Sequence, residues 1–351
     1  MSTLLIYGAT GYTGKLLAQT AKQRNLPAIV AGRNQAAVTA LAQRLGLEGR
    51  TASLDQSDRL DDLLRGVAVL LNAAGPFAVT APILVEACLR TGTHYLDVAG
   101  EIGVFERLHR CDDAARGRGV MLMPGVGINV VASDCLAAHV TNRLPAADRL
   151  AIGISRTLHI SRGSLASMAS LVDDRVVVCR DRTLVRVPVG SLERHFDFGR
   201  GPSSSTAMSW PDVFTAHLTT GIANVEAYVQ IDSLQRSLLQ FARSSAWIWQ
   251  SSIARALLNG DATLLPEGPS YEDQKTRRRA IVVVAEDGRG TRVCSRLRTP
   301  EGYWFTALSA LALAERVLSG EIAAGFQTPA RIYGADFVLG LDGVYRDELE
   351  V

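Results

Sequence analysis

Short apolar runs alternate with longer amphipathic segments over the first 125 residues of the chain. The apolar runs predict strands at residues 4–7, 28–31, 51–55, 67–71, 94–98 and 120–123. The segments between them predict helices at residues 15–24, 34–45, 57–64, 82–90 and 104–116. Six strands with intervening helices indicate an α/β domain with a doubly wound parallel sheet.

The pattern changes after Ser133. Helices are predicted up to residue 144 and at 165–173, but most later signals are those of strands, at 150–154, 175–179, 184–189, 226–231, 278–285 and 291–297. The last two strands are joined by Glu286-Asp287-Gly288-Arg289-Gly290, which is typical of a hairpin. We therefore expect a second α/β domain built on a largely antiparallel sheet.

Composition excludes several classes of protein. The 351 residues are 47% hydrophobic and 21% charged, which excludes a disordered chain. A net charge of +2 provides no global field for nucleic acid. The five cysteines form no CxxC motif and no Cys/His cluster, so neither a disulfide framework nor a metal site is expected. No run is long and apolar enough for a membrane span and the first residues do not resemble a signal peptide, so we expect a cytoplasmic protein.

Three glycines follow the first predicted strand at a spacing of three residues: Gly8, Gly11 and Gly14. Gly8 allows a tight turn, Gly11 allows the backbone to approach a pyrophosphate, and Gly14 allows a helix to pack closely on the strand. The helix that follows places its positive N-terminus at the phosphates. The motif therefore predicts a dinucleotide site in a Rossmann-type sheet, although such a turn can also be purely structural.

Arg33 follows the second strand, where an NAD-binding unit usually carries an acid for the ribose hydroxyls. A guanidinium can pair with a 2′-phosphate, whereas a carboxylate would repel it. The sequence therefore favours NADP(H) over NAD, with an ordinary surface arginine as the other interpretation. Asp55 is expected to meet the adenine edge, and the small residues after the fourth strand, in Asn72-Ala73-Ala74-Gly75-Pro76-Phe77, would let the cofactor approach the sheet.

Hydride transfer often needs a proton donor, and several side chains are candidates. Tyr95 and Asp97 lie at the end of the fifth strand, with Glu101 just beyond, while Tyr12 lies in the glycine turn and His217 in the second half. None has a diagnostic spacing, and each has a structural alternative as a core or capping residue. The chain has no Tyr-x-x-x-Lys pair, which excludes catalysis of the short-chain dehydrogenase type.

The ordered motifs GATGYTG, AGR, NAAGPF, HYLDVAGE and MPGVGINVVASD resemble the saccharopine dehydrogenase-like oxidoreductases. Within them the chain most resembles the branch that includes the bacterial trans-acting enoyl reductases, also over residues 209–228 and 306–339. The resemblance implies an NADP-binding Rossmann domain at 1–130, completed by 303–351, and a substrate or interaction domain at 131–302.

The resemblance also implies roles for particular residues. Gly8, Thr10, Gly11, Tyr12, Thr13 and Gly14 would hold the pyrophosphate, Arg33 the adenosine phosphate, and Ala74, Gly75, Pro76 and Phe77 the nicotinamide side. Tyr95, Asp97 and His217 are the catalytic candidates. The family segment GFDSVPSD carries an acid where this chain has Asn129, so a mechanism that needs that acid is in doubt.

Two enzymatic functions and one binding function remain open. The branch favours reduction of a carbon–carbon double bond in an acyl or polyketide-like substrate, free or carrier-bound. Arg156, Arg162, Arg175 and Arg180 could instead hold the carboxylates of a substrate oxidised or reduced at a carbon–nitrogen bond. The third hypothesis is an NADPH-binding sensor or scaffold without turnover.

Residues 233–258 form an amphipathic, predicted helical segment that carries Trp247 and Trp249. One interpretation is a helix that covers the substrate cleft or forms a homodimer contact. The other is docking to a membrane surface or to a carrier-bound acyl chain.

Overall fold

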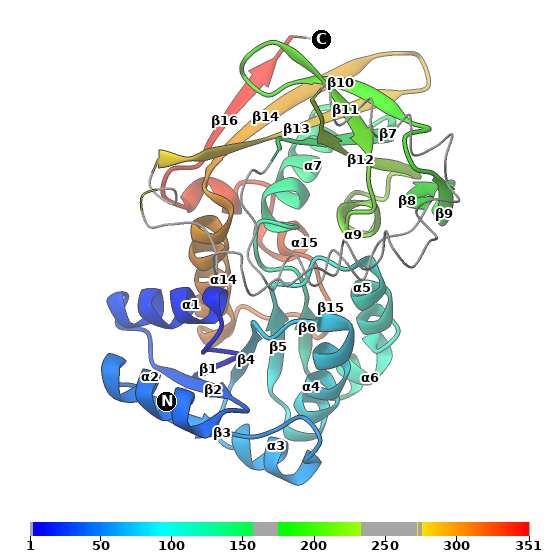
Figure 1. Ribbon diagram of the computed structural model, residues 1–351. Coiled ribbons are helices and arrows are strands. Elements are labelled where there is room, and N and C mark those ends of the chain that lie inside the picture. The colour runs from blue at the N-terminus through cyan, green and yellow to red at the C-terminus, as the bar shows by residue number, and fades with distance from the viewer. Residues whose placement is uncertain (1–2, 157–174, 233–271, 273–275, 351) are drawn as a thin grey trace, which may run out of the picture. The chain divides into compact units, whose positions relative to one another are not determined.

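The computed structural model describes residues 3–156, 175–232, 272 and 276–350, and the chain divides into two compact units (Figure 1). The first unit contains Met1–Val131 and Gly302–Gly334, and the second contains Ala132–Glu301 and Ala335–Val351. Each unit is built on one sheet. The predicted helix at 165–173 and the segment 233–258 lie outside the described residues.

The sheet of the first unit has seven strands in the order β15-β6-β5-β4-β1-β2-β3, and every neighbouring pair is parallel. The strands are β1 (Leu4–Tyr7), β2 (Ala28–Gly32), β3 (Glu48–Thr51), β4 (Val69–Asn72), β5 (His94–Asp97), β6 (Met121–Met123) and β15 (Gly325–Phe326). All residues of β1, β2 and β4 are buried, as expected for parallel strands covered on both faces. This sheet confirms the predicted fold class of the first domain.

The helices of the first unit are α1 (Tyr12–Gln23), α2 (Gln35–Leu45), α3 (Ser57–Leu63), α4 (Phe77–Thr91), α5 (Ile102–His109), α6 (Asp112–Gly117), α14 (Gly302–Leu318) and α15 (Pro329–Tyr333). The segment predicted as one helix at 104–116 forms two helices, α5 and α6, and the second begins at Asp112. There the Asp112 carboxylate accepts the Phe326 backbone N–H of β15 at 2.6 Å. α14 returns from the second half of the sequence and packs against α1, β4 and β5.

The sheet of the second unit has the strand order β10-β11-β12-β7-β13-β14-β16, with β8 pairing with β12 and β9. Its strands are β7 (Ala147–Ile154), β8 (Arg175–Arg180), β9 (Thr183–Pro188), β10 (Glu193–Asp197), β11 (Pro202–Ala207), β12 (Asn224–Gln230), β13 (Arg278–Asp287), β14 (Arg292–Pro300) and β16 (Tyr345–Leu349). Among the described strands of this second sheet, β12 and β7 are the one pair that runs parallel. The sheet is therefore largely antiparallel, as predicted. β13 and β14 form the predicted hairpin.

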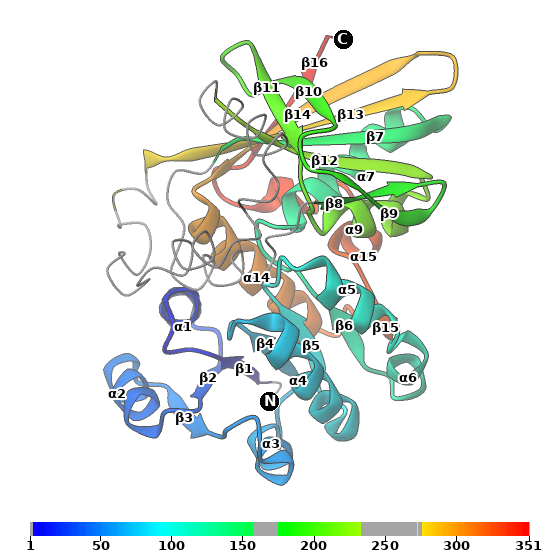
Figure 2. The ribbon, with the colours of Figure 1, turned by 45° about the vertical axis from the view of Figure 1, so that its right-hand side comes forward.

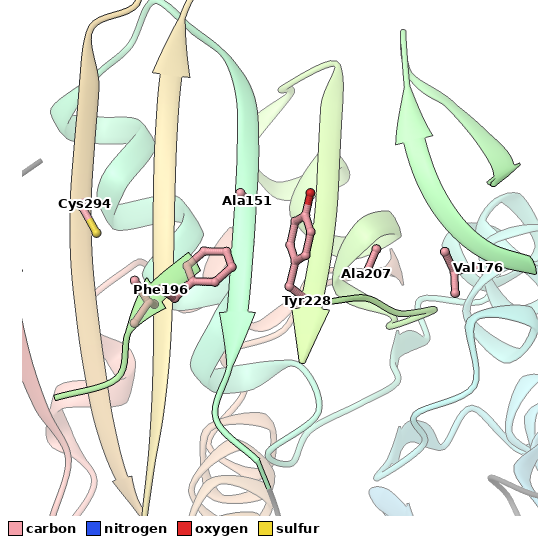
Figure 3. Close-up of a cluster of buried hydrophobic side chains, with 7 residues drawn as sticks. Ala151, Val176, Phe196, Ala207, Tyr228 and Cys294 are labelled. Atoms are coloured by element: carbon pink, nitrogen blue, oxygen red, sulfur yellow. The ribbon is translucent and has the colours of Figure 1, made fainter. Parts of the chain in front are cut away.

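The described helical segments of the second unit are α7 (Val131–Arg143), α9 (Asp212–Thr220) and the 3-10 helix η2 (Phe337–Gly340), and α9 packs against β12 and β8 (Figure 2). The other face of the sheet, away from α9, carries an apolar cluster that includes Ala151, Phe196 and Tyr228 (Figure 3). The Phe196 ring lies directly over Gly153, because a Cβ at Gly153 would come within 2.6 Å of it. Since Phe196 is on β10 and Gly153 on β7, this part of the sheet curls so that β10 covers the face of β7.

The prediction that residues 303–351 complete the first domain is wrong for the last part of this segment. Residues 335–351 belong to the second unit rather than the first, because β16 pairs with β14. Glu348 on β16 fixes this strand further: it accepts the Ser295 hydroxyl at 2.6 Å, lies 2.8 Å from His139 Nε2 and pairs with Arg143.

Replacing Glu348 with glutamine should lower the free energy of unfolding by about 1 kcal/mol at pH 7, because it removes a partly exposed charge at these contacts. Burial raises the pKa of the Glu348 carboxyl. Ser295, His139 and Arg143 lower it by more, so that it stays below its usual value of 4.5. The stabilisation is therefore present above about pH 4.5 and is lost as the pH falls through the lowered folded value. Urea unfolding at pH 7 and pH 4 tests this, with the exposed Glu350→Gln as control; equal midpoints for both variants at pH 7 would contradict it.

Candidate functional site

The turn between β1 and α1 brings three backbone segments close together. Gly8 has φ +80°, and a Cβ there would lie 2.7 Å from the Ala74 backbone nitrogen. A Cβ on Gly14, in the first turn of α1, would lie 2.1 Å from the Gly8 carbonyl oxygen. Gly8 and Ala9 both donate their backbone N–H to the Ala31 carbonyl, at 2.9 and 3.0 Å. The turn is therefore packed against the ends of both neighbouring strands, and only glycine fits at these two positions.

Gly11 differs from the other two glycines. It is exposed, and a Cβ there would meet only the Gly8 carbonyl oxygen, at 3.5 Å. Gly11 is also the N-cap of α1, where it contributes no side-chain cap to the helix N-terminus. The N-terminus of a twelve-residue helix that has no side-chain cap among the described residues, beside an exposed glycine, fits the phosphates of a dinucleotide. Thr10, Tyr12 and Thr13, which were predicted to hold the pyrophosphate, are half-buried on either side of it.

β1 lies between β4 and β2, which is the point where the strand order reverses. Ligands of such sheets bind at this switch point, outside the carboxyl ends of the strands. Arg33 follows β2 and is exposed, and Asp55 is exposed beyond β3. Burial raises the pKa of Tyr7 at the end of β1, while the Arg33 charge lowers it and the Asp55 charge raises it. Both charges therefore lie near the switch point, where the adenosine half of a dinucleotide was predicted.

A buried hydrogen-bond network supports the segment after β4. Asn72, the last residue of β4, is fully buried, and its Oδ1 accepts the Ala74 backbone N–H at 2.9 Å. The Thr80 hydroxyl donates to the Ala74 carbonyl at 2.6 Å. Asn72 Nδ2 donates to Thr80 Oγ1 and to the Tyr95 hydroxyl, both at 3.1 Å. Both polar backbone atoms of Ala74 are thus fixed from inside the unit.

The network continues from Tyr95 to Asp97, two of the catalytic candidates. The Tyr95 hydroxyl donates to Asp97 Oδ2 at 2.9 Å, and Asp97 Oδ1 accepts the backbone N–H groups of Ala99 and Gly125, each at 2.9 Å. Burial raises the pKa of Asp97 to about 7, despite these three donors, and raises that of Tyr95 well above 10. Both side chains have no exposed surface. Their observed contacts connect β5 to the loops that follow β5 and β6.

The other sequence candidates near this edge are also part of the framework. Glu101 is the N-cap of α5 and is 6% exposed. Asn129 lies beside Gly100, since a Cβ at Gly100 would approach its Nδ2 to 2.7 Å. Tyr12 packs edge-on against Tyr303 at the start of α14, with ring centroids 5.0 Å apart. Sequence reasoning missed Tyr303, because its place beside the glycine turn depends on the return of α14 to the first unit.

His217 belongs to the second unit, so it is not part of the network that contains Tyr95 and Asp97. It lies on α9 and its Nδ1 is 2.7 Å from the Ile222 carbonyl oxygen. Asp212 at the start of the same helix is fully buried. Burial raises the pKa of this carboxyl well above its usual value, and the nearby charge of Asp134 raises it further. Among the described residues no donor meets hydrogen-bond geometry at its carboxyl oxygens, although the Ser133 hydroxyl is near enough to oppose the pKa shift in part.

Two of the four arginines proposed to hold carboxylates, Arg156 and Arg180, lie apart in the structure. Arg156 follows β7 and pairs with Asp232, whereas Arg180 ends β8 and pairs with Glu226. Glu226 lies opposite Ala151, five residues from Arg156 and so on the order of 15 Å away along the strands. Arg162 lies outside the described residues.

Two further expectations concern metals and membranes. Within the part of the chain that the structure describes, no group of three or more His, Cys, Asp or Glu side chains is arranged to hold a metal ion. In that same part, the helices are too short or too polar to cross a membrane. The segment 233–258, to which peripheral membrane contact was assigned, is outside it.

Comparison with known proteins finds sequence matches to part of this chain. The model of the saccharopine dehydrogenase NADP binding domain matches residues 4–123. A saccharopine dehydrogenase-like oxidoreductase of Mus musculus is 24% identical over 161 residues, which cover 40% of this chain and 38% of that protein. A trans-acting enoyl reductase of Mycobacterium leprae (strain TN) is 32% identical over 142 residues, which cover 37% of this chain and 33% of that protein. The chain therefore matches less than two fifths of the length of these relatives.

A solved structure extends the likeness of fold to the whole chain. Apo histidine-tagged saccharopine dehydrogenase (L-Glu forming) from Saccharomyces cerevisiae superposes with a TM-score of 0.66 and covers 100% of both chains. At 14% sequence identity this likeness shows the fold alone. The family model and the glycine turn, by contrast, concern the same residues. Together they support the resemblance seen in the motifs: residues 4–123 of this chain match the saccharopine dehydrogenase NADP binding domain.

Proposed function

We propose that this protein is an oxidoreductase that transfers hydride between NADP(H) and an acyl substrate, with reduction of a carbon–carbon double bond as the reaction. The observation that carries the cofactor assignment is the switch point of the parallel sheet. There the helix N-terminus at Gly11, the exposed guanidinium of Arg33 and the internally fixed Ala74 lie at the ends of three adjacent strands. Bound NADPH would supply the hydride.

The residues of the chain have separate tasks in this proposal. The N-terminus of α1 neutralises the diphosphate, and Arg33 pairs with the 2′-phosphate. Asn72 and Thr80 hold Ala74 so that the backbone of residues 74–77 keeps one conformation beside the nicotinamide. We assign Tyr95 and Asp97 to positioning this loop, because both are fully buried and hydrogen-bonded to it through Asn72.

The choice of substrate rests on the relatives. Two of the curated proteins that match part of this chain are named trans-acting enoyl reductases, at 28% and 32% identity. Chemistry at a carbon–nitrogen bond is the second candidate, since other relatives are named after saccharopine dehydrogenase. The scattered arginines Arg156 and Arg180, each paired with its own carboxylate, disfavour the carboxylate-binding cluster that this second chemistry was expected to use.

A substrate panel tests the function. The purified protein would be incubated with NADPH and either enoyl thioesters of several chain lengths or imino acids, and loss of reduced nicotinamide would be followed by absorbance. Turnover with enoyl thioesters alone supports the proposal, and turnover with imino acids alone replaces it by the second candidate. Tight NADPH binding without turnover of either class contradicts the enzymatic proposal and favours a sensor. Reactions without the protein control for loss of reduced nicotinamide that is not enzymatic.

Replacing Arg33 with aspartate is expected to weaken NADPH binding by about 10- to 100-fold and to leave NADH binding nearly unchanged. The reason is the loss of one charge-assisted hydrogen-bonded pair, together with repulsion of the 2′-phosphate by the new carboxylate. Fluorescence titration with both cofactors measures the two affinities, and Arg331→Asp, at an exposed position of α15, controls for the change of net charge. An equal loss for NADPH and NADH would show that Arg33 does not contact the 2′-phosphate.

A further inference from the structure

The second unit contains a hollow lined by charged side chains that the proposed hydride transfer does not use. Its volume is about 290 Å³, and its lining consists of Arg149, Leu150, Arg180, Arg194, Asn224, Glu226 and Glu286. These residues come from β7, β8, β10, β12 and β13, so one sheet positions all of them. The volume is at the lower end of the range for small-molecule sites, which limits an occupant to a compact molecule.

The charged residues continue the face that carries the apolar cluster of Figure 3. Side chains two residues apart on a strand share a face, so Arg149 lies on the face of Ala151, and Glu226 on that of Tyr228. Phe196 and Arg194 are related in the same way on β10, which curls over this face. Apart from Leu150, the side chains that line the hollow are therefore charged or polar, and the apolar cluster lies further along the same strands.

The two glutamates already have their own cationic partners. Glu226 pairs with Arg180 and accepts the Tyr228 hydroxyl. Glu286 accepts Arg292 Nε at 2.9 Å. Each carboxylate is thus neutralised by an arginine other than Arg149, and its side chain is only 15% or 21% exposed.

Arg149 and Arg194 provide the surplus positive charge. The carboxylate that pairs with Arg149 is Asp148, at 4.0 Å, and the Arg149 side chain is 69% exposed. Arg194 is 3.6 Å from Glu286, beyond a strong hydrogen bond, and Glu286 is already paired with Arg292. Among the described residues, these two guanidinium groups thus have only long ion pairs, of 4.0 and 3.6 Å. They match an oxyanion, which guanidinium binds through two parallel hydrogen bonds.

We propose that this hollow binds a small organic anion through a carboxylate or phosphate group placed between Arg149 and Arg194. This site lies wholly within the second unit, and its existence does not depend on the proposed reaction of the first.

The test measures thermal stability of the full chain in the presence of inorganic phosphate, phenyl phosphate or succinate, with sodium chloride added to keep the ionic strength constant. A saturable rise in Tm is expected, with an apparent Kd on the order of 1 mM or tighter. A stronger effect of phenyl phosphate or of succinate identifies phosphate or carboxylate as the preferred group. The absence of a saturable rise with all three probes would show that the arginines and glutamates form only a solvated ion-pair network.

Variants identify the residues that bind the anion. Arg149→Gln and Arg194→Gln should each weaken the apparent affinity by about tenfold or more. Arg289→Gln, in the exposed turn between β13 and β14, should leave it unchanged. Phosphate can also bind at the N-terminus of α1, so Arg33→Gln is included. A Tm rise that survives in Arg149→Gln and disappears in Arg33→Gln would assign the anion to the cofactor site and overturn the proposal.

Discussion

Replacing Gly14 with alanine is expected to destabilise the protein by about 3 kcal/mol or more and to abolish NADPH binding. The added Cβ would lie 2.1 Å from the Gly8 carbonyl oxygen and 2.7 Å from the Ala9 Cα. Both are backbone atoms, so α1 must move away from the turn as a unit, at the upper end of the costs of overpacking. Urea unfolding followed by circular dichroism, together with NADPH titration, measures the two effects.

Gly11→Ala is the matched comparison for that variant. Its backbone angles, φ −77° and ψ 171°, suit any residue, and the new Cβ would be 3.5 Å from the Gly8 carbonyl oxygen. We expect its stability to lie within about 0.5 kcal/mol of that of the unmodified protein, but the methyl group should reduce NADPH affinity by about tenfold. Normal binding by Gly11→Ala would place the diphosphate elsewhere. Normal stability of Gly14→Ala would contradict the packing of α1 on the turn.

Replacing Asp97 with asparagine is expected to remove a large part of the pH dependence of stability. Burial raises the pKa of Asp97 to about 7, from an ordinary value of 3.8, and the Glu101 charge adds to the shift. Because the folded state prefers the protonated form, the stability that Asp97 contributes is full below about pH 4 and is lost as the pH rises to about 7. The slope is at most about 1.4 kcal/mol per pH unit, so the total is on the order of 4 kcal/mol.

Unfolding free energies of Asp97→Asn and of the unmodified protein should therefore be compared at pH 4.5, 6 and 7.5. The difference between the two proteins isolates Asp97 from Asp212 and Glu348, which titrate in both. Asp97→Asn should gain stability relative to the unmodified protein as the pH rises from 4.5 to 7.5, because only the unmodified protein must bury a carboxylate charge at the higher pH. Asp113→Asn, at an exposed position of α6, is the control. A constant difference across the three pH values would show that Asp97 does not change its protonation over this range.

Burial on both faces explains why the central strands could be predicted from the sequence and the edge strands could not. Residues of β1, β2 and β4 are continuously apolar because helices cover both faces of a parallel sheet. β3 reads Glu-Gly-Arg-Thr and is mostly exposed at the sheet edge, so the strand was predicted three to four residues too late, at 51–55. β16 reads Tyr-Arg-Asp-Glu-Leu, and its place beside β14 depends on contacts such as Glu348 with Ser295.

Two strands of the second unit could not be predicted from the sequence either. β10 and β11 were not predicted, because the segment 193–207 is rich in Ser, Gly and charged residues. Only Phe196 of β10 packs into the cluster with Tyr228, and it does so across the curled sheet. One buried aromatic residue in a polar strand produces no alternating pattern for a sequence-based prediction to detect.

The candidate site was predictable where it depends on backbone shape and unpredictable where it depends on tertiary hydrogen bonds. The glycine spacing and the position of Arg33 are local properties, and the structure places both at the switch point. The role of Asn72 is not local, since its partners Thr80 and Tyr95 lie 8 and 23 residues further along the chain. Tyr95 and Asp97 were noticed as candidate acids, but their shared network with Asn72 became visible only in the fold.

The order of segments in the two units has a consequence for synthesis on the ribosome. Residues 302–334 complete the first sheet, yet they emerge only after residues 132–301, which belong to the other unit. Until then β6 lacks its neighbour β15, and α1 lacks the helix α14 that packs against it. The nascent nucleotide-binding sheet therefore presents an open strand edge during most of translation, and such edges are templates for pairing with other chains. Chaperone protection at this stage should matter more than for a chain whose domains are consecutive.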